Sequence, residues 1–299
     1  MIDFAEIKSE YPFKSNIIKV KSYDYHYVDE GKDNGEETLL MVHGNLSWSF
    51  MFRNLINELS QDYRVIAPDH LGCGLSDKPQ DFPYRLETHI DNLESLLFAL
   101  KLKKVTLIMH DWGAAIGMGL AMRHPGKIAR LVILNSSAFS LPWLPLRVNF
   151  LRIPWLNKKF VRDSSLFLNI SLQMLCRKAL PPIVKKGYKY PYQTSEDRIA
   201  LLRFIQDLPL DPEHVSFEVL LEIEHGLWMF RETPVCLVWG MRDWYFSRRY
   251  LKRWTLYYPQ AQVLELEDAG HYVLEDECAR SAAFIRDFLS QPQPASIII

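Results

Sequence analysis

The chain has 299 residues, of which 48% are hydrophobic and 24% are charged, and its formal net charge is −1. A chain of this length buries most of its apolar surface, which excludes a marginal mini-fold. The near-neutral charge, without a basic stripe, argues against nucleic acid as a partner.

Short apolar runs alternate with helix-period segments along the chain, which predicts a mostly parallel sheet covered by helices on both faces. At the amino-terminal edge, 17–20 and 25–28 are typical of an antiparallel hairpin. The remaining predicted strands, which complete an eight-stranded sheet, are 38–42, 63–67, 105–109, 131–134, 235–239 and 263–266.

The regular spacing of strands breaks after Asn135, and the next strand begins only at Val235. This interval is far longer than the few residues of an ordinary connection. We therefore predict an inserted helical cap at 139–225, between core segments 1–138 and 226–299. The helix-like pieces are 166–179, 195–205 and 217–230.

The strand predicted at 105–109 leads directly into His110-Asp111-Trp112-Gly113. A sharp strand-to-helix turn would raise Asp111 above the sheet, where Ser stands in the G-x-S-x-G turn of α/β-hydrolases. The amino terminus of the following helix would stabilise an ionised carboxylate. Taken alone, an Asp at this place is more often only a helix N-cap.

Two distant residues favour a catalytic role for Asp111. His271 follows the last predicted strand, and Asp243 follows the strand before it. All three residues then lie at the carboxyl ends of strands, where open α/β sheets place their sites. Their chain order is that of the α/β-hydrolase triad. We therefore expect an α/β-hydrolase fold with Asp111 as nucleophile, His271 as base and Asp243 as triad acid.

The run His43-Gly44-Asn45-Leu46 follows the first long strand and is expected to supply an anion pocket. Backbone N–H groups at Asn45 or Leu46 and at Trp112 would stabilise negative charge there. The Asn45 amide and the Trp112 indole are two further donors, able to face a halide or an oxyanion. We expect His43 to be a buried turn residue rather than a catalyst.

Four short motifs are distributed along nearly the whole chain. They are Asn45 directly after His-Gly, DHLGCGLSDKP at 69–79, HDWG at 110–113, and Gly270-His271. Together they resemble the haloalkane dehalogenase superfamily, which shares its Asp nucleophile with epoxide hydrolases. One departure is Leu46, where that family usually has Pro. Another branch carries its triad acid, a Glu, near 135–139, but this stretch contains no carboxylate, so the resemblance places the acid at Asp243.

The segments 203–210 (RFIQDLPL) and 235–246 (VCLVWGMRDWYF) look closest to the β-lactone decarboxylases of olefin biosynthesis. Those relatives open a cis-3,4-dialkyl β-lactone to carbon dioxide and an alkene. The resemblance implies a small hydrophobic substrate, no cofactor and no metal, and it allows a homo-oligomer or an assembly with olefin-pathway enzymes. The expected pocket residues are Phe139, Trp143, Phe150, Trp155 and Trp244.

Three other functions stay open at this point. In a haloalkane dehalogenase, Asp111 would displace halide and His271 would activate water to hydrolyse the ester. An epoxide hydrolase needs two cap tyrosine hydroxyls, for which Tyr188, Tyr190 and Tyr192 are available. A non-catalytic binding module usually lacks a triad member, and this sequence has all three.

The sequence also indicates a cellular location. Its amino terminus, MIDFAEIKSEYPF, is acidic and polar, whereas a signal peptide would be basic and then apolar. No run approaches the roughly 20 apolar residues that a transmembrane helix needs. The four cysteines lack metal-site spacing, and we interpret them as reduced thiols in a cytoplasmic protein. They are Cys73, Cys176, Cys236 and Cys278.

Overall fold

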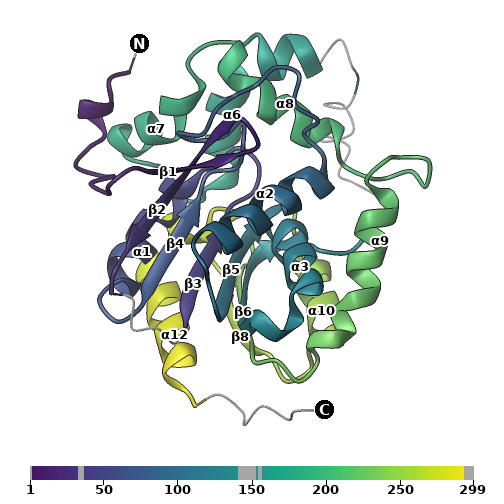
Figure 1. Cartoon of the computed structure of the whole chain (residues 1–299). Helices are drawn as coiled ribbons and strands as arrows, with labels where there is room; N and C mark the ends of the chain where they lie inside the picture. Colours follow the sequence, from purple (N-terminus) through teal and green to yellow (C-terminus); the bar gives the residue numbers. More distant parts are fainter. Residues whose placement is uncertain (1, 33–36, 141–152, 154–156, 293–299) are drawn as a thin grey trace.

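The computed structural model describes residues 2–32, 37–140, 153 and 157–292 (Figure 1). Within these residues, eight strands form one sheet in the order β1-β2-β4-β3-β5-β6-β7-β8. β1 pairs with β2 and β2 with β4 in antiparallel fashion, and all other neighbours are parallel. The predicted fold, a mostly parallel α/β-hydrolase sheet with an antiparallel edge, is confirmed.

Each predicted strand is present: β3 has the predicted bounds, and the others differ from the predicted apolar run by one to three residues at one or both ends. β3 and β5 are buried throughout, because helices cover both faces of the sheet at its centre. The strands are β1 (Asn16–Val20), β2 (Tyr23–Glu30), β3 (Thr38–Val42), β4 (Arg64–Pro68), β5 (Val105–Asp111), β6 (Ile128–Ser136), β7 (Val235–Gly240) and β8 (Gln262–Leu266).

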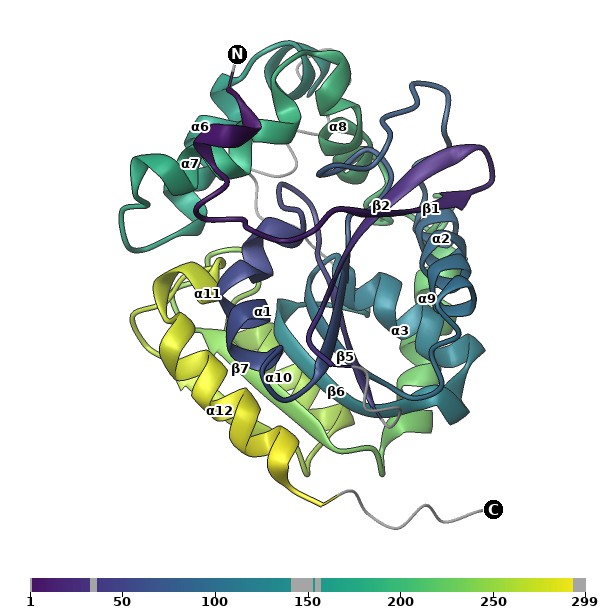
Figure 2. The same cartoon turned by 60° about the vertical axis from the view of Figure 1, so that its left-hand side comes forward.

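Helices cover both faces of the sheet (Figure 2). α1 (Arg53–Leu59) packs against α12 (Cys278–Ser290) on one face. α2 (Leu86–Ala99), α3 (Gly113–Arg123) and α9 (Phe217–Gly226) pack together on the other. The remaining core helices are α10 (Arg248–Tyr257) and the short α11 (Val273–Asp276).

Cap helices lie over the carboxyl ends of the parallel strands, at the top of Figure 1. They are α6 (Leu166–Leu175), α7 (Pro182–Lys189) and α8 (Ile199–Gln206), with a π-helical turn, η4, at Lys158–Arg162. The helix predicted at 166–179 ends at Leu175, because Cys176 is extended. α9 crosses the predicted cap boundary at 225 and packs against the core helices α2 and α3.

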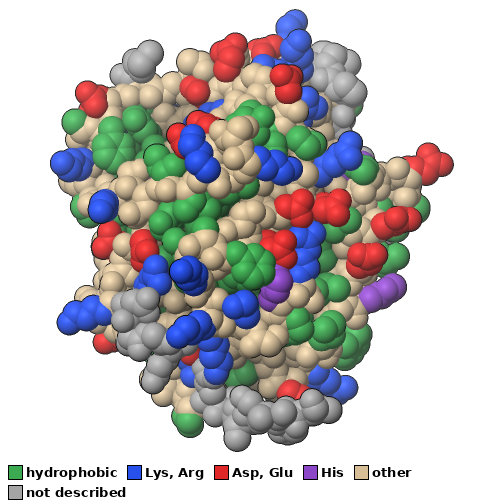
Figure 3. Space-filling view, viewed as in Figure 1, with side chains coloured by type: hydrophobic (Ala, Val, Ile, Leu, Met, Phe, Trp, Pro, Cys, Tyr) green, Lys and Arg blue, Asp and Glu red, His purple; other side chains and the backbone are tan. Residues whose placement is uncertain are grey.

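The surface carries both signs of charge. On the face shown in Figure 3, Lys and Arg side chains are interspersed with Asp and Glu, as the near-neutral net charge suggests. All four cysteines are free of disulfide bonds. Across the described part of the chain, no helix is both long and apolar enough to cross a membrane.

Candidate active site

Asp111 lies on a sharp turn between β5 and α3. β5 ends at Asp111 and α3 begins at Gly113, so only Trp112 separates strand from helix. Asp111 has φ of 54°, a left-handed conformation that is strained for a residue with a Cβ. A Cβ at Gly113 would lie 2.1 Å from the Val42 carbonyl oxygen, so only glycine lets the helix approach β3 this closely. The turn therefore presents the Asp111 carboxylate above the sheet.

Backbone donors hold the Asp111 carboxylate. Its Oδ1 accepts a hydrogen bond from the Asn45 N–H at 2.8 Å, and the Trp112 N–H is a second backbone donor. A Cβ at Gly44 would lie 2.1 Å from Oδ1, so this approach also requires glycine. Burial raises the pKa of Asp111 above its usual value, although the charge of His271 and the two N–H groups oppose that rise. The carboxylate is thus poorly hydrated yet stabilised as an anion.

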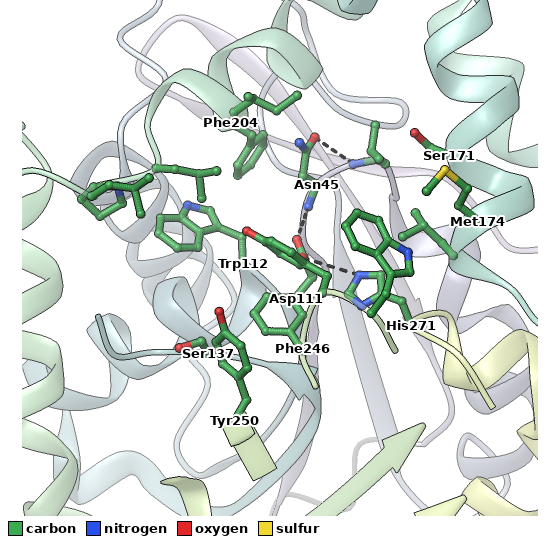
Figure 4. Close-up of a pocket in the computed structure, with 18 of the residues that line it drawn as sticks. Asn45, Asp111, Trp112, Ser137, Ser171, Met174, Phe204, Phe246, Tyr250 and His271 are labelled. Carbon is green, nitrogen blue, oxygen red and sulfur yellow. Dashed lines mark hydrogen bonds and ion pairs between the residues drawn. The ribbon is translucent and has the colours of Figure 1, made fainter. Parts of the chain in front are cut away.

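His271 lies between two carboxylates. Its Nδ1 is 2.8 Å from Asp243 Oδ2. Its Nε2 is 3.6 Å from Asp111 Oδ2, and Figure 4 marks this contact between His271 and Asp111. All three side chains are buried. Burial alone would lower the pKa of His271, but the charge and hydrogen bond of Asp243, together with the charge of Asp111, raise it above its usual value. The imidazolium is therefore favoured in this position.

Asn135 is a site residue that the sequence did not identify. At the end of β6 it has φ of 26°, which Asn tolerates better than most residues. Its Nδ2 donates to Asp243 Oδ2 at 3.0 Å and to the Gly240 carbonyl at 3.1 Å, while its Oδ1 accepts from the Gly240 N–H at 2.7 Å. A polar residue ending the apolar run LVIL was the signal available. We call Asp111, Asn135, Asp243 and His271 the catalytic floor.

His110 is a second residue that the sequence left unassigned. It is buried beside His271, with 4.5 Å between the ring centroids. Its Nε2 donates to the His271 carbonyl at 2.9 Å, since a carbonyl can only accept. Burial, reinforced by the nearby charge of His271, holds the pKa of His110 well below its usual value. A neutral His110 therefore supports the backbone of the loop that carries His271.

The loop after β3 differs from the expected anion pocket. The Leu46 N–H does not face Asp111 but donates to Asn45 Oδ1 at 2.8 Å. Asn45 Nδ2 makes a long hydrogen bond, 3.5 Å, to the Leu201 carbonyl on α8. Within this loop the backbone N–H of Asn45 is the donor that reaches Asp111, and Asn45 itself lines the cavity, so an anion-binding role for the Asn45 amide or the Leu46 N–H stays a prediction.

His43 at the base of this loop is buried, as expected for a turn residue. Its Nδ1 donates to the Gly44 carbonyl at 2.8 Å, and its Nε2 accepts from the His70 N–H at 3.0 Å. Burial lowers its pKa. A neutral His43 can make both bonds at once, which fixes the start of the loop.

Above the catalytic floor lies a cavity of about 270 Å³ (Figure 4). Its lining is mostly apolar, which suits a hydrophobic ligand. Phe139 and Trp244 line it as predicted, whereas Trp143, Phe150 and Trp155 lie outside the described residues. We call its cap side the cap wall: Phe160, Phe167, Ile170, Met174 and Phe204.

The three cap tyrosines are not among the residues that line this cavity. The Tyr188 hydroxyl donates to Glu275 at 2.6 Å, and the Tyr192 hydroxyl donates to the Ser47 carbonyl at 3.1 Å. The Tyr190 ring packs edge-on against Phe4, with 5.5 Å between centroids. None of the three is thus placed to hold an epoxide oxygen above Asp111.

Comparison with known proteins agrees with this architecture. The family described as alpha/beta hydrolase fold matches residues 37–277. A cis-3-alkyl-4-alkyloxetan-2-one decarboxylase of Shewanella oneidensis is 39% identical over 94% of this chain and 90% of its own length. Its namesake from Xanthomonas campestris is 38% identical over 89% of this chain and 92% of its own length. The crystal structure of the haloalkane dehalogenase DatA from Agrobacterium tumefaciens superposes with a TM-score of 0.83, at 25% identity, over 93% of this chain and 96% of that one.

Proposed function

Because this chain belongs to the α/β-hydrolase family, in its haloalkane-dehalogenase-like superfamily near the β-lactone decarboxylases, we propose that it converts cis-3,4-dialkyl β-lactones to cis-alkenes and carbon dioxide. The observation that carries the proposal is a buried carboxylate, Asp111, at the floor of a mostly apolar cavity. The names of the two relatives reported above support the choice of substrate.

Asp111 is the nucleophile in this proposal. A carboxylate suits attack on saturated carbon because it is already ionised at neutral pH, whereas a serine hydroxyl must first lose a proton. Its oxygen attacks the ring carbon that bears the lactone oxygen, C4. The C4–O bond breaks, and its electrons leave on the new carboxylate group at C3. An alkyl ester of Asp111 results, and release of ring strain favours its formation.

The ester then breaks down without water. The bond between C3 and the carboxylate carbon breaks, and carbon dioxide leaves. The electron pair of that bond forms the C3=C4 double bond, while the C4–O bond to Asp111 breaks and returns the free carboxylate. Inversion in the first step followed by anti elimination in the second converts a cis-lactone into a cis-alkene. The two steps together consume no proton, water molecule or cofactor.

His271 and Asp243 have an electrostatic role in this scheme. The elevated pKa of His271 favours the imidazolium, whose Nε2 lies 3.6 Å from Asp111. A positive charge there stabilises the Asp111 carboxylate as it is released. Asp243, itself held by Asn135, fixes the ring that carries this charge. The Trp112 indole, which lines the cavity, is a side-chain donor available to the leaving carboxylate.

Product analysis tests the proposal. A long-chain cis-3,4-dialkyl β-lactone and a 1-bromoalkane of comparable length are each incubated with the protein, with Asp111→Asn as control. We expect the cis-alkene and carbon dioxide, at a kcat/KM above that of bromide release. A β-hydroxy acid as the main lactone product would contradict the decarboxylase assignment.

Haloalkane dehalogenation is the second candidate, and the superposition with DatA favours it. The reaction would begin with the same ester but would need His271 to activate water. More efficient release of bromide than formation of alkene would establish this function instead. An assembly with enzymes that make the β-lactone, or a homo-oligomer, in the cytoplasm is also part of our proposal.

A further inference from the structure

Leu46 has an unusual backbone conformation. Its φ is 61°, in the left-handed region that leucine rarely adopts. Two tyrosine hydroxyls from distant parts of the chain hold this turn. Tyr272 donates to the Leu46 carbonyl at 2.9 Å, and Tyr192 donates to the Ser47 carbonyl at 3.1 Å. Strained backbone of this kind persists where the surroundings over-determine it, and it often marks a functional site.

The Leu46 N–H points toward the Asn45 side chain. That N–H can only donate, so it requires the carboxamide oxygen, and Oδ1 accepts it at 2.8 Å. The amide nitrogen must then face the other way, where the Leu201 carbonyl accepts its long hydrogen bond. Figure 4 shows the Asn45 carboxamide pointing away from Asp111, while its backbone N–H points toward Asp111. The orientation of the amide is therefore set by the residue that follows it.

We propose that Leu46 is a specificity-determining positioning residue, which keeps the Asn45 amide from joining the Trp112 indole in a two-donor halide site. Two donors aimed at one point bind a halide in a cavity that excludes water, and one donor binds it far less well. Decarboxylation of a β-lactone releases no halide. The inference deepens the proposed function, because it explains how an Asp111 ester enzyme disfavours carbon–halogen substrates.

Bromide affinity tests this proposal without any turnover. Sodium bromide is titrated while tryptophan fluorescence is followed, with Trp112→Phe as the baseline for the other seven tryptophans of the eight in the chain. Leu46→Pro deletes the N–H and cannot take a positive φ. Leu46→Gly keeps the N–H and accepts the left-handed conformation. The two variants thus separate loss of the hydrogen bond from loss of the leucine side chain.

We expect Leu46→Pro to bind bromide about ten-fold more tightly than the wild type, the gain typical of one added charge-assisted donor. Asn45→Ala introduced on top of Leu46→Pro should cancel this gain. Leu46→Gly should bind bromide like the wild type, and Asn45→Ala alone should leave the weak wild-type affinity unchanged.

Three results would overturn the inference. They are a folded Leu46→Pro without tighter bromide binding, a Leu46→Gly that binds as tightly as Leu46→Pro, and a clear loss of wild-type bromide affinity in Asn45→Ala. The bromide affinity of Asn45→Ala tests the inference even if circular dichroism shows that Leu46→Pro does not fold. Failure of lactone turnover would count against the proposed function alone, since none of these titrations involves a lactone.

Discussion

The catalytic floor and the cap wall face each other across one cavity but are built on different principles. On the floor, Asp243 accepts from Asn135 and from the Tyr245 N–H and contacts His271, while Asp111 is held by backbone N–H groups. The cap wall contributes apolar side chains without fixed polar partners. The floor therefore fixes which bonds are made and broken, whereas the cap wall fixes only the shape and length of the substrate.

The largest expected effect comes from removing the nucleophile. Asp111→Asn should lower kcat by at least about 10⁴-fold, because a neutral amide cannot form the ester. The melting temperature should stay close to that of the wild type, since the amide still accepts from the Asn45 N–H. Steady-state kinetics together with an intact mass that excludes deamidation checks this, and retention of a few per cent of activity would rule out Asp111 as nucleophile.

His271→Ala should separate the two reactions. Hydrolysis of an alkyl ester needs a base, so turnover of a bromoalkane should fall by about 10³-fold and an Asp111 adduct should accumulate. Decarboxylation needs no base and should fall by only about 10-fold to 100-fold, from lost electrostatic stabilisation. Intact-protein mass spectrometry detects the adduct. Equal losses in both reactions would mean that His271 acts as a base in each.

The two reactions should also differ in their dependence on pH. Ester formation needs ionised Asp111, whose pKa is raised, so decarboxylation should decline as the pH falls toward that pKa from above. As the pH falls, hydrolytic debromination should begin to decline at a higher pH than decarboxylation does. The reason is that His271 is protonated below its own raised pKa and then cannot accept a proton from water. In each limb the rate should fall about ten-fold per pH unit. Superimposable profiles of kcat for the two substrates would argue against separate roles.

The smallest effect is expected at the cap wall. Phe167→Trp adds volume to the apolar lining and should raise the KM of the longest-chain β-lactone by about ten-fold, with little change in kcat. Phe98→Trp is a matched control, because Phe98 is 53% exposed on α2 and does not line the cavity. A fall in kcat for short and long chains alike would show that Phe167 influences the floor.

The sequence predicts the floor better than the wall, for a physical reason. A strand that ends in a turn carries its last residue to the edge of the sheet, so the positions of Asp111, Asp243 and His271 follow from strand order. Asn135 was missed because its partners depend on where β7 ends. The direction of the Leu46 N–H could not be predicted either, because it depends on the backbone torsions of the loop rather than on residue type.

The cap is less predictable because its helices are short and pack mostly on other short cap elements rather than on a regular sheet. α7 was not predicted, since its residues PIVKKGYK contain Pro182 and Gly187, which disfavour a helix interior, together with three lysines. Pro182 at its first turn was the signal available. The segment 208–210, which lines the cavity beyond α8, has no periodic pattern at all.

The central claim is that the Asp111 ester in decarboxylation breaks down without water, and isotope labelling tests it most directly. The protein is allowed many turnovers of a cis-β-lactone in water enriched in oxygen-18, and the peptide containing Asp111 is then analysed by mass spectrometry. We predict that Asp111 keeps its original oxygens, whereas turnover of a bromoalkane under the same conditions labels it. Incorporation of oxygen-18 into Asp111 during alkene formation would contradict the account.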